Sequence, residues 1–278
     1  MRILSWNIQW GRGADGRVAL DRTIERLRAC GPLDAICLQE VARNWPGLKG
    51  GEGPLDEPAL LAAAFPGMVP IFAPGLECGD GAGGLRGFGN LMLVSGEVGP
   101  VYRRLLPAPV DPGERSLQRT CLETVVRRGA RELRLMTTHL EYFSALQRRA
   151  QVAALRQIQR DALDEAGQAR SDRAESLFGA PPRPAAALLC GDLNFAPDSE
   201  EYRMLGGDEV WIDAWARRHG TRRHAPTVGL HGAEWPDHPY CCDYVWLSPA
   251  LADALVSVEV LADTAASDHQ PVLVELDA

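Results

Sequence analysis

The chain opens with a strand–helix–strand pattern, and this pattern limits the possible folds more than any other feature. Residues 2–8 form a short apolar run typical of a strand. Residues 18–30 place apolar side chains at helical spacing with Arg and Glu between them, and Gly31-Pro32 ends that helix. Residues 34–39 form a second buried strand. The pattern predicts a crossover unit of an α/β protein.

The rest of the chain mixes strands joined by tight turns with strands joined by helices. A helix-like patch near 60–65 is expected, and the alternating runs at 120–127 and 132–139 predict a hairpin. The other expected elements are strands at 90–95, 186–190, 243–247, 255–261 and 271–276, helices at 144–166, 198–205 and 210–218, and a solvated linker at 171–184. This mixture predicts one domain over 1–278 with two mixed sheets face to face and helices outside.

Residues 42–90 are rich in Gly and Pro and contain a GxGxxG pattern at Gly79, Gly81 and Gly84. A phosphate-binding turn of this type should leave a strand and open a helix, whereas this one leads into another strand. We therefore do not expect a dinucleotide site here. Residues 79–90 are expected to form a loop, either simply mobile or placed over an active site.

Charge and cysteine content narrow the class of protein. The chain has 29 Lys plus Arg and 37 Asp plus Glu, so its net charge is −8, which argues against gripping nucleic acid by bulk charge. No apolar run approaches the roughly 18 residues that span a bilayer, and the first residues lack the apolar core of a signal peptide. Seven cysteines, an odd number mostly within apolar runs, suggest a reducing compartment, so we expect a cytoplasmic protein.

Polar residues interrupt the ends of several predicted strands. Burying a carboxylate or an imidazole costs several kcal/mol unless it is paired or bound to a metal. Taken singly, each of these residues could be a cap or a satisfied core group. If they gather at one end of successive strands, they are better explained as a functional site, since strand ends are where α/β sites lie. The residues are Asn7, Glu40, His139, Asp192, Asn194, Asp243, Asp268 and His269.

Six motifs in order, WNIQ, LQE, TTHL, GDLNFAP, CDYVWL and SDHQPV, resemble those of the endonuclease/exonuclease/phosphatase superfamily. This superfamily includes DNase I-like nucleases, abasic-site endonucleases, deadenylases, inositol polyphosphate 5-phosphatases and neutral sphingomyelinases. The resemblance implies a DNase I-like fold, a four-layer α/β/β/α sandwich. It also implies hydrolysis of a phosphoester that depends on a divalent metal, Mg²⁺ or alternatively Mn²⁺.

The resemblance guides the assignment of metal and substrate contacts. Glu40 matches the first metal ligand, with Asn7 beside it as a ligand or orienting amide and Asp268 as a further ligand, in keeping with the preference of hard cations for oxygen. Arg119 falls where relatives often place a phosphate-contacting arginine, and Arg43 has a similar status. For both arginines, an ordinary exposed charge is an equally good interpretation.

The catalytic roles implied by the resemblance involve five residues. His269 would be the base or the phosphate-binding imidazole, and Asp243 would hold its other nitrogen. Asp192 and Asn194 would position the attacking water and the scissile phosphate. His139 would donate a hydrogen bond to a non-bridging phosphoryl oxygen.

Departures from the family motifs bear on the substrate. Abasic-site endonucleases have Thr-Lys after the glutamate, where this chain has Val41-Ala42. Inositol 5-phosphatases carry arginines where this chain has residues 195–197 and Tyr244. No apolar hairpin stands out to enter a membrane, which weakens the sphingomyelinase interpretation. The chain is thus closest to compact bacterial-type members, and we expect a phosphodiester substrate of nucleic acid, nucleotide or phospholipid type.

Other functions stay open. One alternative is a phosphomonoesterase acting on a small molecule, and another is a non-catalytic binding domain that keeps the fold. A degenerate member should have lost Glu40, Asp192 or His269, and all three are present, which favours the enzyme. A DNA-repair nuclease is a weaker third possibility because of the net charge. The sequence points to no protein partner.

Two segments are expected to set specificity: 42–90, with Trp45 and Phe88, and 219–242, with three further ring side chains. Rings beside a phosphate site can stack on bases, although most Trp residues simply pack. The second segment also raises the question of zinc, because mixed His and Cys suit that ion. It lacks CxxC and HxxxH pairs, so solvated histidines are the better interpretation. The residues concerned are His219, His224, His231, Trp235, His238, Tyr240, Cys241 and Cys242.

Overall fold

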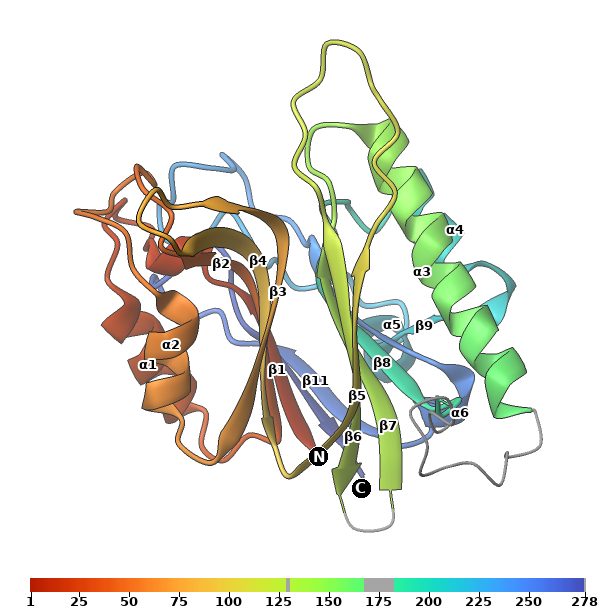
Figure 1. Ribbon diagram of the computed structural model, residues 1–278. Coiled ribbons are helices and arrows are strands. Elements are labelled where there is room, and N and C mark those ends of the chain that lie inside the picture. Colours follow the sequence, from red (N-terminus) through yellow and green to blue (C-terminus); the bar gives the residue numbers. More distant parts are fainter. Residues whose placement is uncertain (129–130, 168–182, 278) are drawn as a thin grey trace.

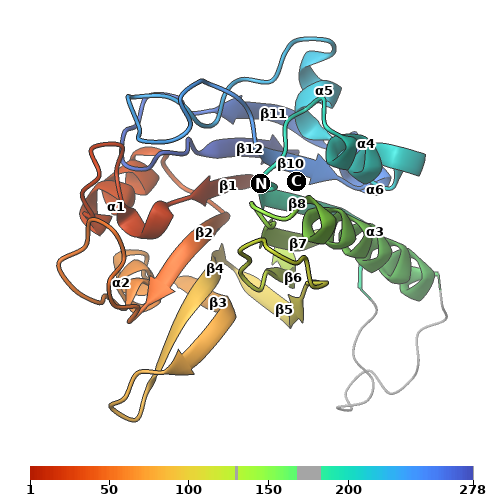
Figure 2. The ribbon, with the colours of Figure 1, turned by 90° about the horizontal axis from the view of Figure 1, so that it is seen from above.

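Two six-stranded mixed sheets lie face to face, with helices on their outer faces, in the computed structural model of the chain (Figures 1 and 2). The structure describes residues 1–128, 131–167 and 183–277. The architecture is the four-layer sandwich expected from the sequence.

The first sheet has the strand order β11-β12-β1-β2-β4-β3. Its centre is the parallel pair β1 (Arg2–Asn7) and β2 (Ala35–Arg43), joined by α1 (Leu20–Ala29). The crossover unit predicted at the start of the chain is therefore confirmed. The antiparallel neighbours are β3 (Met68–Gly79), β4 (Leu85–Ser95), β11 (Leu255–Val260) and β12 (Val272–Leu276), and α2 (Glu57–Ala64) joins α1 on the outer face.

The second sheet has the order β5-β6-β7-β8-β10-β9, and its parallel pair is β7–β8. The expected hairpin is the antiparallel pair β6–β7, although its turn residues 129–130 lie outside the described residues. The strands are β5 (Glu97–Leu105), β6 (Thr120–Arg128), β7 (Arg131–His139), β8 (Ala187–Asp192), β9 (Ile212–Asp213) and β10 (Asp243–Leu247), and the helices are α3 (Ala145–Ala166), α4 (Glu200–Gly206), α5 (Ala214–His219) and α6 (Pro249–Ala252).

The main core fills the space between the sheets, and two further cores lie under the helices. Burying each Leu or Ile side chain contributes about 1.5–3 kcal/mol. The central strands contribute to two cores because side chains alternate along a strand. On β2, Cys37 faces the opposite sheet while Ile36 and Leu38 lie under α1 and α2. Burial on both faces makes such strands read as continuous apolar runs.

The segment 42–90 is more ordered than the sequence suggested. Its second half is the long hairpin β3–β4, and the GxGxxG pattern forms the tip, where the Asp80 carboxylate accepts hydrogen bonds from the Ala82 and Gly84 amides at 2.8 and 2.9 Å. The expected loop at 79–90 is therefore wrong beyond Gly84. Strand β5 was also not predicted. Most of the expected linker at 171–184 lies outside the described residues.

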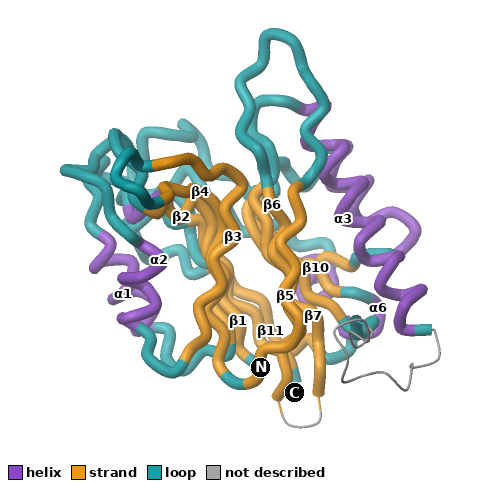
Figure 3. The backbone as a smooth tube through the Cα atoms, in the orientation of Figure 1, coloured by secondary structure: helices purple, strands orange, loops and turns teal. Residues whose placement is uncertain are grey.

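Loops gather at one end of the sandwich, the upper end in Figure 3, and both termini lie at the other (Figure 1). Strands β1, β2, β7 and β8 end toward these loops. Across the second sheet the register pairs His139 with Asp192 and Asp192 with Asp243, so three candidate side chains form one row. Within the described residues, no helix combines the length and apolar character needed to cross a bilayer.

Candidate active site

The row of register partners in the second sheet forms one side of the candidate site. Asp192 ends β8, between His139 at the end of β7 and Asp243 at the start of β10. The residue before Asp192 must be glycine, because a Cβ on Gly191 would lie 1.9 Å from the Thr138 carbonyl oxygen and its φ is +141°. The GD pair of the motif thus lets two strands approach closely where the carboxylate is needed.

Backbone strain marks the same region. Gln9, Glu40 and Asn194 have φ values of 44°, 55° and 53°, a region that costs energy for residues other than glycine and that is frequent at functional sites. At Glu40 the register between β2 and β4 shifts, and the bulge turns the carboxylate out of the strand pattern. The buried carboxylate of Glu57 accepts the Ala42 amide at 2.7 Å, which supports the backbone beyond the bulge.

Asn7 joins the two sheets at the centre of the site. Its Nδ2 donates to Glu40 Oε1 and to Asp192 Oδ2, each at 3.0 Å, and the residue is fully buried. Both carboxylates therefore point to one place although they come from different sheets. This is the arrangement in which an amide orients two potential metal ligands.

Asp268 approaches from the loop before β12. Its Oδ2 accepts a hydrogen bond from Gln9 Nε2 at 2.6 Å, and Ser267 Oγ lies 3.2 Å from its Oδ1. Ser267 Oγ also lies 2.8 Å from the Asn7 carbonyl oxygen, which ties this loop to β1. The sequence motif SDH thus contributes one residue that anchors the loop and one carboxylate that faces the site.

His269 and Asp243 form a buried pair. The ring Nδ1 lies 2.9 Å from Asp243 Oδ2, and Nε2 lies 3.7 Å from Asp192 Oδ2. Burial lowers the pKa of His269, but the charges of Asp243 and Asp192 outweigh burial and raise it well above the usual value. The imidazolium is therefore the favoured form, held by one carboxylate and directed toward another.

His139 has the opposite character. Burial, with the charges of Arg119 and His269, lowers its pKa well below the usual value, so the neutral ring is favoured. Its Nε2 lies 2.9 Å from Asn194 Nδ2, which also donates to the Leu140 carbonyl at 2.9 Å. The site therefore holds one charged and one neutral imidazole on either side of Asp192.

The acidic residues form a cluster that fits a divalent cation. Burial and the neighbouring charge of Asp268 raise the pKa of Glu40 to about 7, and burial with the charge of Asp243 raises that of Asp192 to about 6. Among the described residues, no Lys or Arg forms an ion pair with Glu40, Asp192 or Asp268. Ligand atoms of Glu40, His139 and Asp192 lie within 4.8 Å of one another. Carboxylate oxygens that no Lys or Arg neutralises are suitable ligands for Mg²⁺ or Mn²⁺.

A cleft of about 480 Å³ opens over this cluster. Arg119 lines it, buried, with its Nε 3.2 Å from Glu141 Oε2. Arg43 does not line it: its guanidinium pairs with Glu77 at 2.5 Å and lies 5.3 Å from the centre of the Phe72 ring. Seven of the ten predicted site residues line the cleft, namely Glu40, Arg119, His139, Asp192, Asn194, Asp268 and His269. Asn7 and Asp243 lie beneath it in contact with these residues.

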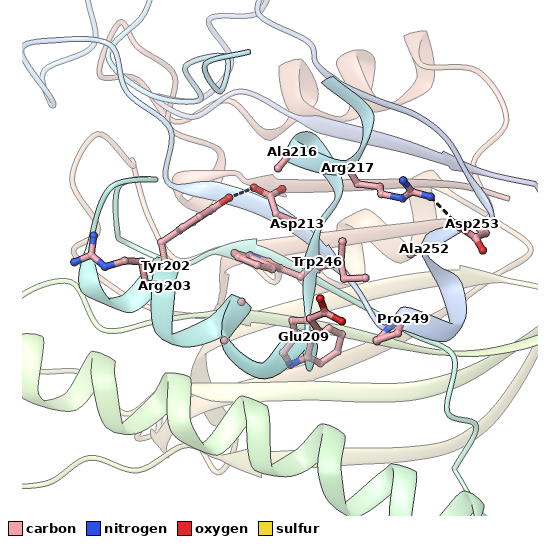
Figure 4. A pocket seen from close by; sticks show the side chains of 14 residues that line it. Tyr202, Arg203, Glu209, Asp213, Ala216, Arg217, Trp246, Pro249, Ala252 and Asp253 are labelled. Atoms are coloured by element: carbon pink, nitrogen blue, oxygen red, sulfur yellow. Dashed lines mark hydrogen bonds and ion pairs between the residues drawn. The ribbon is translucent and has the colours of Figure 1, made fainter. Parts of the chain in front are cut away.

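A larger hollow of about 690 Å³ lies elsewhere, beside β9, α4, α5 and α6 (Figure 4). It contains none of the predicted site residues. Its Tyr202 hydroxyl donates to Asp213 at 2.6 Å, and Arg217 pairs with Asp253 at 2.9 Å. These groups satisfy one another, so size alone would have pointed to the wrong cavity.

The histidines of 219–242 are dispersed among separate partners. His219 and His231 lie 3.0 and 2.8 Å from backbone carbonyls, His224 pairs with Asp213, and His238 pairs with the neighbouring Asp237. In the described part of the chain, Cys242 is the one member of the predicted His/Cys set that joins a cluster of possible ligands, together with Asp192 and His269.

Several supporting residues were not singled out from the sequence. Gln9 and Ser267 lie within the quoted WNIQ and SDH motifs, so the signal was present. Glu57 and Thr227 lie in segments without a motif. The Thr227 hydroxyl accepts hydrogen bonds from the Cys242 and Asp243 amides at 3.1 and 3.2 Å. Only the folded chain brings them to the site.

The fold and the site together define a class of protein: four-layer sandwiches in which buried carboxylates and a His–Asp pair meet at one end of two sheets. The chain belongs to the Endonuclease/Exonuclease/phosphatase family, whose sequence model matches residues 4–269. Members of this family are phosphoric ester hydrolases. No curated protein matches the sequence.

Solved structures agree on the fold. An endonuclease/exonuclease/phosphatase from Beutenbergia cavernae is 26% identical, with a TM-score of 0.67 over 99% of this chain and 70% of that one. The mannosyl-6-phosphatase Bt3783 of Bacteroides thetaiotaomicron is 16% identical (TM-score 0.67, 99% of both chains). The human Nocturnin catalytic domain is 18% identical (TM-score 0.62, 99% of this chain and 92% of that one). The last two likenesses show the fold alone.

Proposed function

We propose that this protein is a divalent-metal-dependent phosphoesterase that hydrolyses a phosphodiester. The observation that carries the proposal is the meeting, in one cleft, of a buried acidic cluster and a His–Asp pair. Family membership supports the reaction class, and the convergence of Glu40, His139 and Asp192 ligand atoms supports a bound metal.

Glu40, Asn7 and Asp268 would hold the metal, preferably Mg²⁺. When bound, a divalent cation neutralises charge on the phosphoryl oxygens and compensates the carboxylates that now repel one another. Gln9 acts as a positioning residue in this scheme, because its amide fixes the Asp268 carboxylate at 2.6 Å.

Asp192 would orient the attacking water, because its Oδ2 lies between Asn7 and His269 and is fixed by a hydrogen bond from Asn7. The water oxygen bonds to phosphorus and gives up a proton as the ester P–O bond breaks, and the leaving oxygen takes up one proton in exchange. His269, charged and held by Asp243, would stabilise the negative charge that develops on the phosphoryl group. Asn194, neutral His139 and Arg119 would contact the remaining phosphoryl oxygens.

Hydrolysis of bis-p-nitrophenyl phosphate and of p-nitrophenyl phosphate tests the proposal, each with Mg²⁺, Mn²⁺ and EDTA. We expect metal-dependent cleavage of the diester, and His269→Ala serves as the blank. Cleavage of the monoester alone would instead establish a phosphatase acting on a small molecule. Absence of metal-dependent turnover on both, and on a panel of nucleotide and phospholipid diesters, would contradict the proposal and favour the non-catalytic binding domain.

A further inference from the structure

Aromatic side chains surround the cleft above the acidic cluster. Five rings and one leucine line it: Trp10, Phe88, Leu117, Tyr142, Phe143 and Trp235. Trp10 lies in the short 3-10 helix Gln9–Gly11 that follows β1, Phe88 lies in β4, and their ring centres are 6.2 Å apart. The other three rings come from loops of the second sheet. A polar floor that suits a phosphate is thus bordered by apolar surface.

The rings from the second sheet are exposed yet ordered. Tyr142 and Trp235 are each 39% exposed and Phe143 is 42% exposed. Tyr142 meets Trp235 edge to face at 5.2 Å and Phe143 edge to face at 4.8 Å. Edge-to-face packing fixes the rings and leaves ring surface open to the cleft. Exposed aromatic groups gathered at a pocket indicate a binding surface rather than core packing.

An ion cluster holds the Trp235 loop in place. Glu234, the preceding residue, pairs with Arg12 at 2.8 Å and with Lys49 at 2.5 Å. The Lys49 carbonyl accepts a hydrogen bond from Trp10 Nε1 at 3.0 Å. Rings that come from both sheets are therefore fixed through one small cluster, and a pre-ordered surface loses less entropy when it binds a ligand.

The charges around the cleft limit the ligand to few phosphates. Arg119 is the one Arg or Lys among the described residues that line the cleft, and Glu141 already neutralises it. Arg12 and Lys49 nearby are neutralised by Glu234, whereas Arg115, 4.3 Å from the centre of the Phe143 ring, keeps its charge and is one cation close to the cleft. A polyanion would find little to pair with here.

We infer that Tyr142 and Trp235 form a subsite for a planar aromatic group attached to the scissile phosphate, of nucleobase size, in a substrate with a single phosphate. The inference rests on the proposed function, because it places this group beside the same reaction centre. Stacking of one base on such a ring strengthens binding about 5- to 150-fold.

Calorimetric titration with thymidine 5′-monophosphate and with 2-deoxyribose 5-phosphate tests this subsite, because the two compounds share the sugar and the phosphate and the second has an anomeric hydroxyl in place of the base. Ca²⁺ replaces Mg²⁺ so that binding is measured without turnover. We expect the nucleotide to bind at least fivefold more tightly than the sugar phosphate to the unmodified protein. Trp235→Ala and Tyr142→Ala should each remove most of that difference while the affinity for the sugar phosphate stays unchanged.

Trp45→Ala is the matched control, since Trp45 lies outside the cleft lining, with the Arg86 guanidinium 5.2 Å from its ring centre. Trp235→Phe should keep most of the preference. Equal affinities for the two compounds, no binding of either, or an equal loss in Trp45→Ala would overturn the subsite. Diester hydrolysis is measured separately on the same protein, so loss of the subsite with turnover intact is distinguishable from failure of the proposed function.

Discussion

Two of the His–Asp pairs among the described residues, His269–Asp243 and His224–Asp213, have similarly short contact distances. At the cleft, His269 Nδ1 lies 2.9 Å from Asp243. At the larger hollow, His224 Nε2 lies 2.5 Å from Asp213, which lines that hollow. The difference is in what surrounds each pair. His269 presents its other nitrogen to the Asp192 carboxylate, whereas His224 packs against the rings of Tyr202, Trp215 and Tyr244.

The two aspartates differ in the same sense. Asp213 accepts hydrogen bonds from the Tyr202 hydroxyl at 2.6 Å and from the Trp215 amide at 2.8 Å, and this second bond caps α5. The hydrogen bonds that Asp213 accepts therefore stabilise the fold. The pair in the cleft instead belongs to a region with repelling carboxylates and strained backbone. An Asp–His contact therefore indicates a catalytic site only where neighbouring polar groups are not already satisfied by one another and can bind a ligand.

The difference between the two His–Asp pairs is tested most strongly by replacing each histidine with alanine. His269→Ala should lower kcat/KM by about 10²–10⁴-fold, the usual contribution of a proton-transferring or charge-stabilising group, with a far-UV spectrum like that of the unmodified protein. His224→Ala should leave kcat/KM within about threefold while lowering the melting temperature, because it acts on packing. Comparable activity losses in the two variants would remove the distinction between the pairs.

Replacing Asp243 or Asp213 should also distinguish the two His–Asp pairs, with a smaller effect on activity than removal of the imidazoles. Asp243→Asn should lower kcat/KM about tenfold or more, because the imidazolium loses its charged partner. Asp213→Asn should leave kcat/KM nearly unchanged and lower the free energy of unfolding by about 1–3 kcal/mol, since it disturbs a cap and the half-buried contacts with Tyr202 and His224. Denaturant unfolding and steady-state kinetics on both variants measure this, and full activity in Asp243→Asn would refute the pairing.

Binding of a divalent metal should raise the melting temperature of the protein. At saturating Mg²⁺, near 100 times the dissociation constant, the melting temperature should rise by roughly 5–10 °C. Glu40→Gln should lose that rise. In EDTA at pH 8 the same variant should melt above the unmodified protein, because the raised pKa of Glu40 means that its ionised form destabilises the fold above that pKa.

Glu209→Gln is the control for the metal experiment, because Glu209 lines the larger hollow and not the cleft. Its melting temperature should follow that of the unmodified protein with and without Mg²⁺. An unchanged Mg²⁺ titration in Glu40→Gln would remove this residue from the ligand set.

The smallest effect is expected for Arg43, which the sequence suggested as a substrate contact and the structure places outside the cleft lining. Arg43→Ala should change kcat/KM by about twofold or less, because it removes an exposed ion pair of little energetic value. Arg119→Ala, in the cleft, should raise KM more strongly. A loss in Arg43→Ala that equals the loss in Arg119→Ala would restore Arg43 as a substrate contact.

The sequence by itself determined the alternation of strands and helices and the residue types at the strand ends. These features are local: apolar periodicity sets the element, and a polar residue that ends an apolar run is visible in the run itself. The motifs around Glu40, Asp192 and His269 were enough to indicate the family. Of the hairpin at 68–95, only residues 90–95 were predicted as a strand. The remainder contains Gly and Pro that lower the apparent strand propensity, yet pairing and burial outweigh that preference.

Only the tertiary structure decided which residues meet. Asn7 reaches carboxylates 33 and 185 positions away, and Glu57 reaches the bulge beyond Glu40 from a separate helix. Trp235 and Tyr142 form a pair across 93 positions because two loops are held over one cleft. Such contacts depend on strand register and sheet packing, which are long-range properties that no window of the sequence contains.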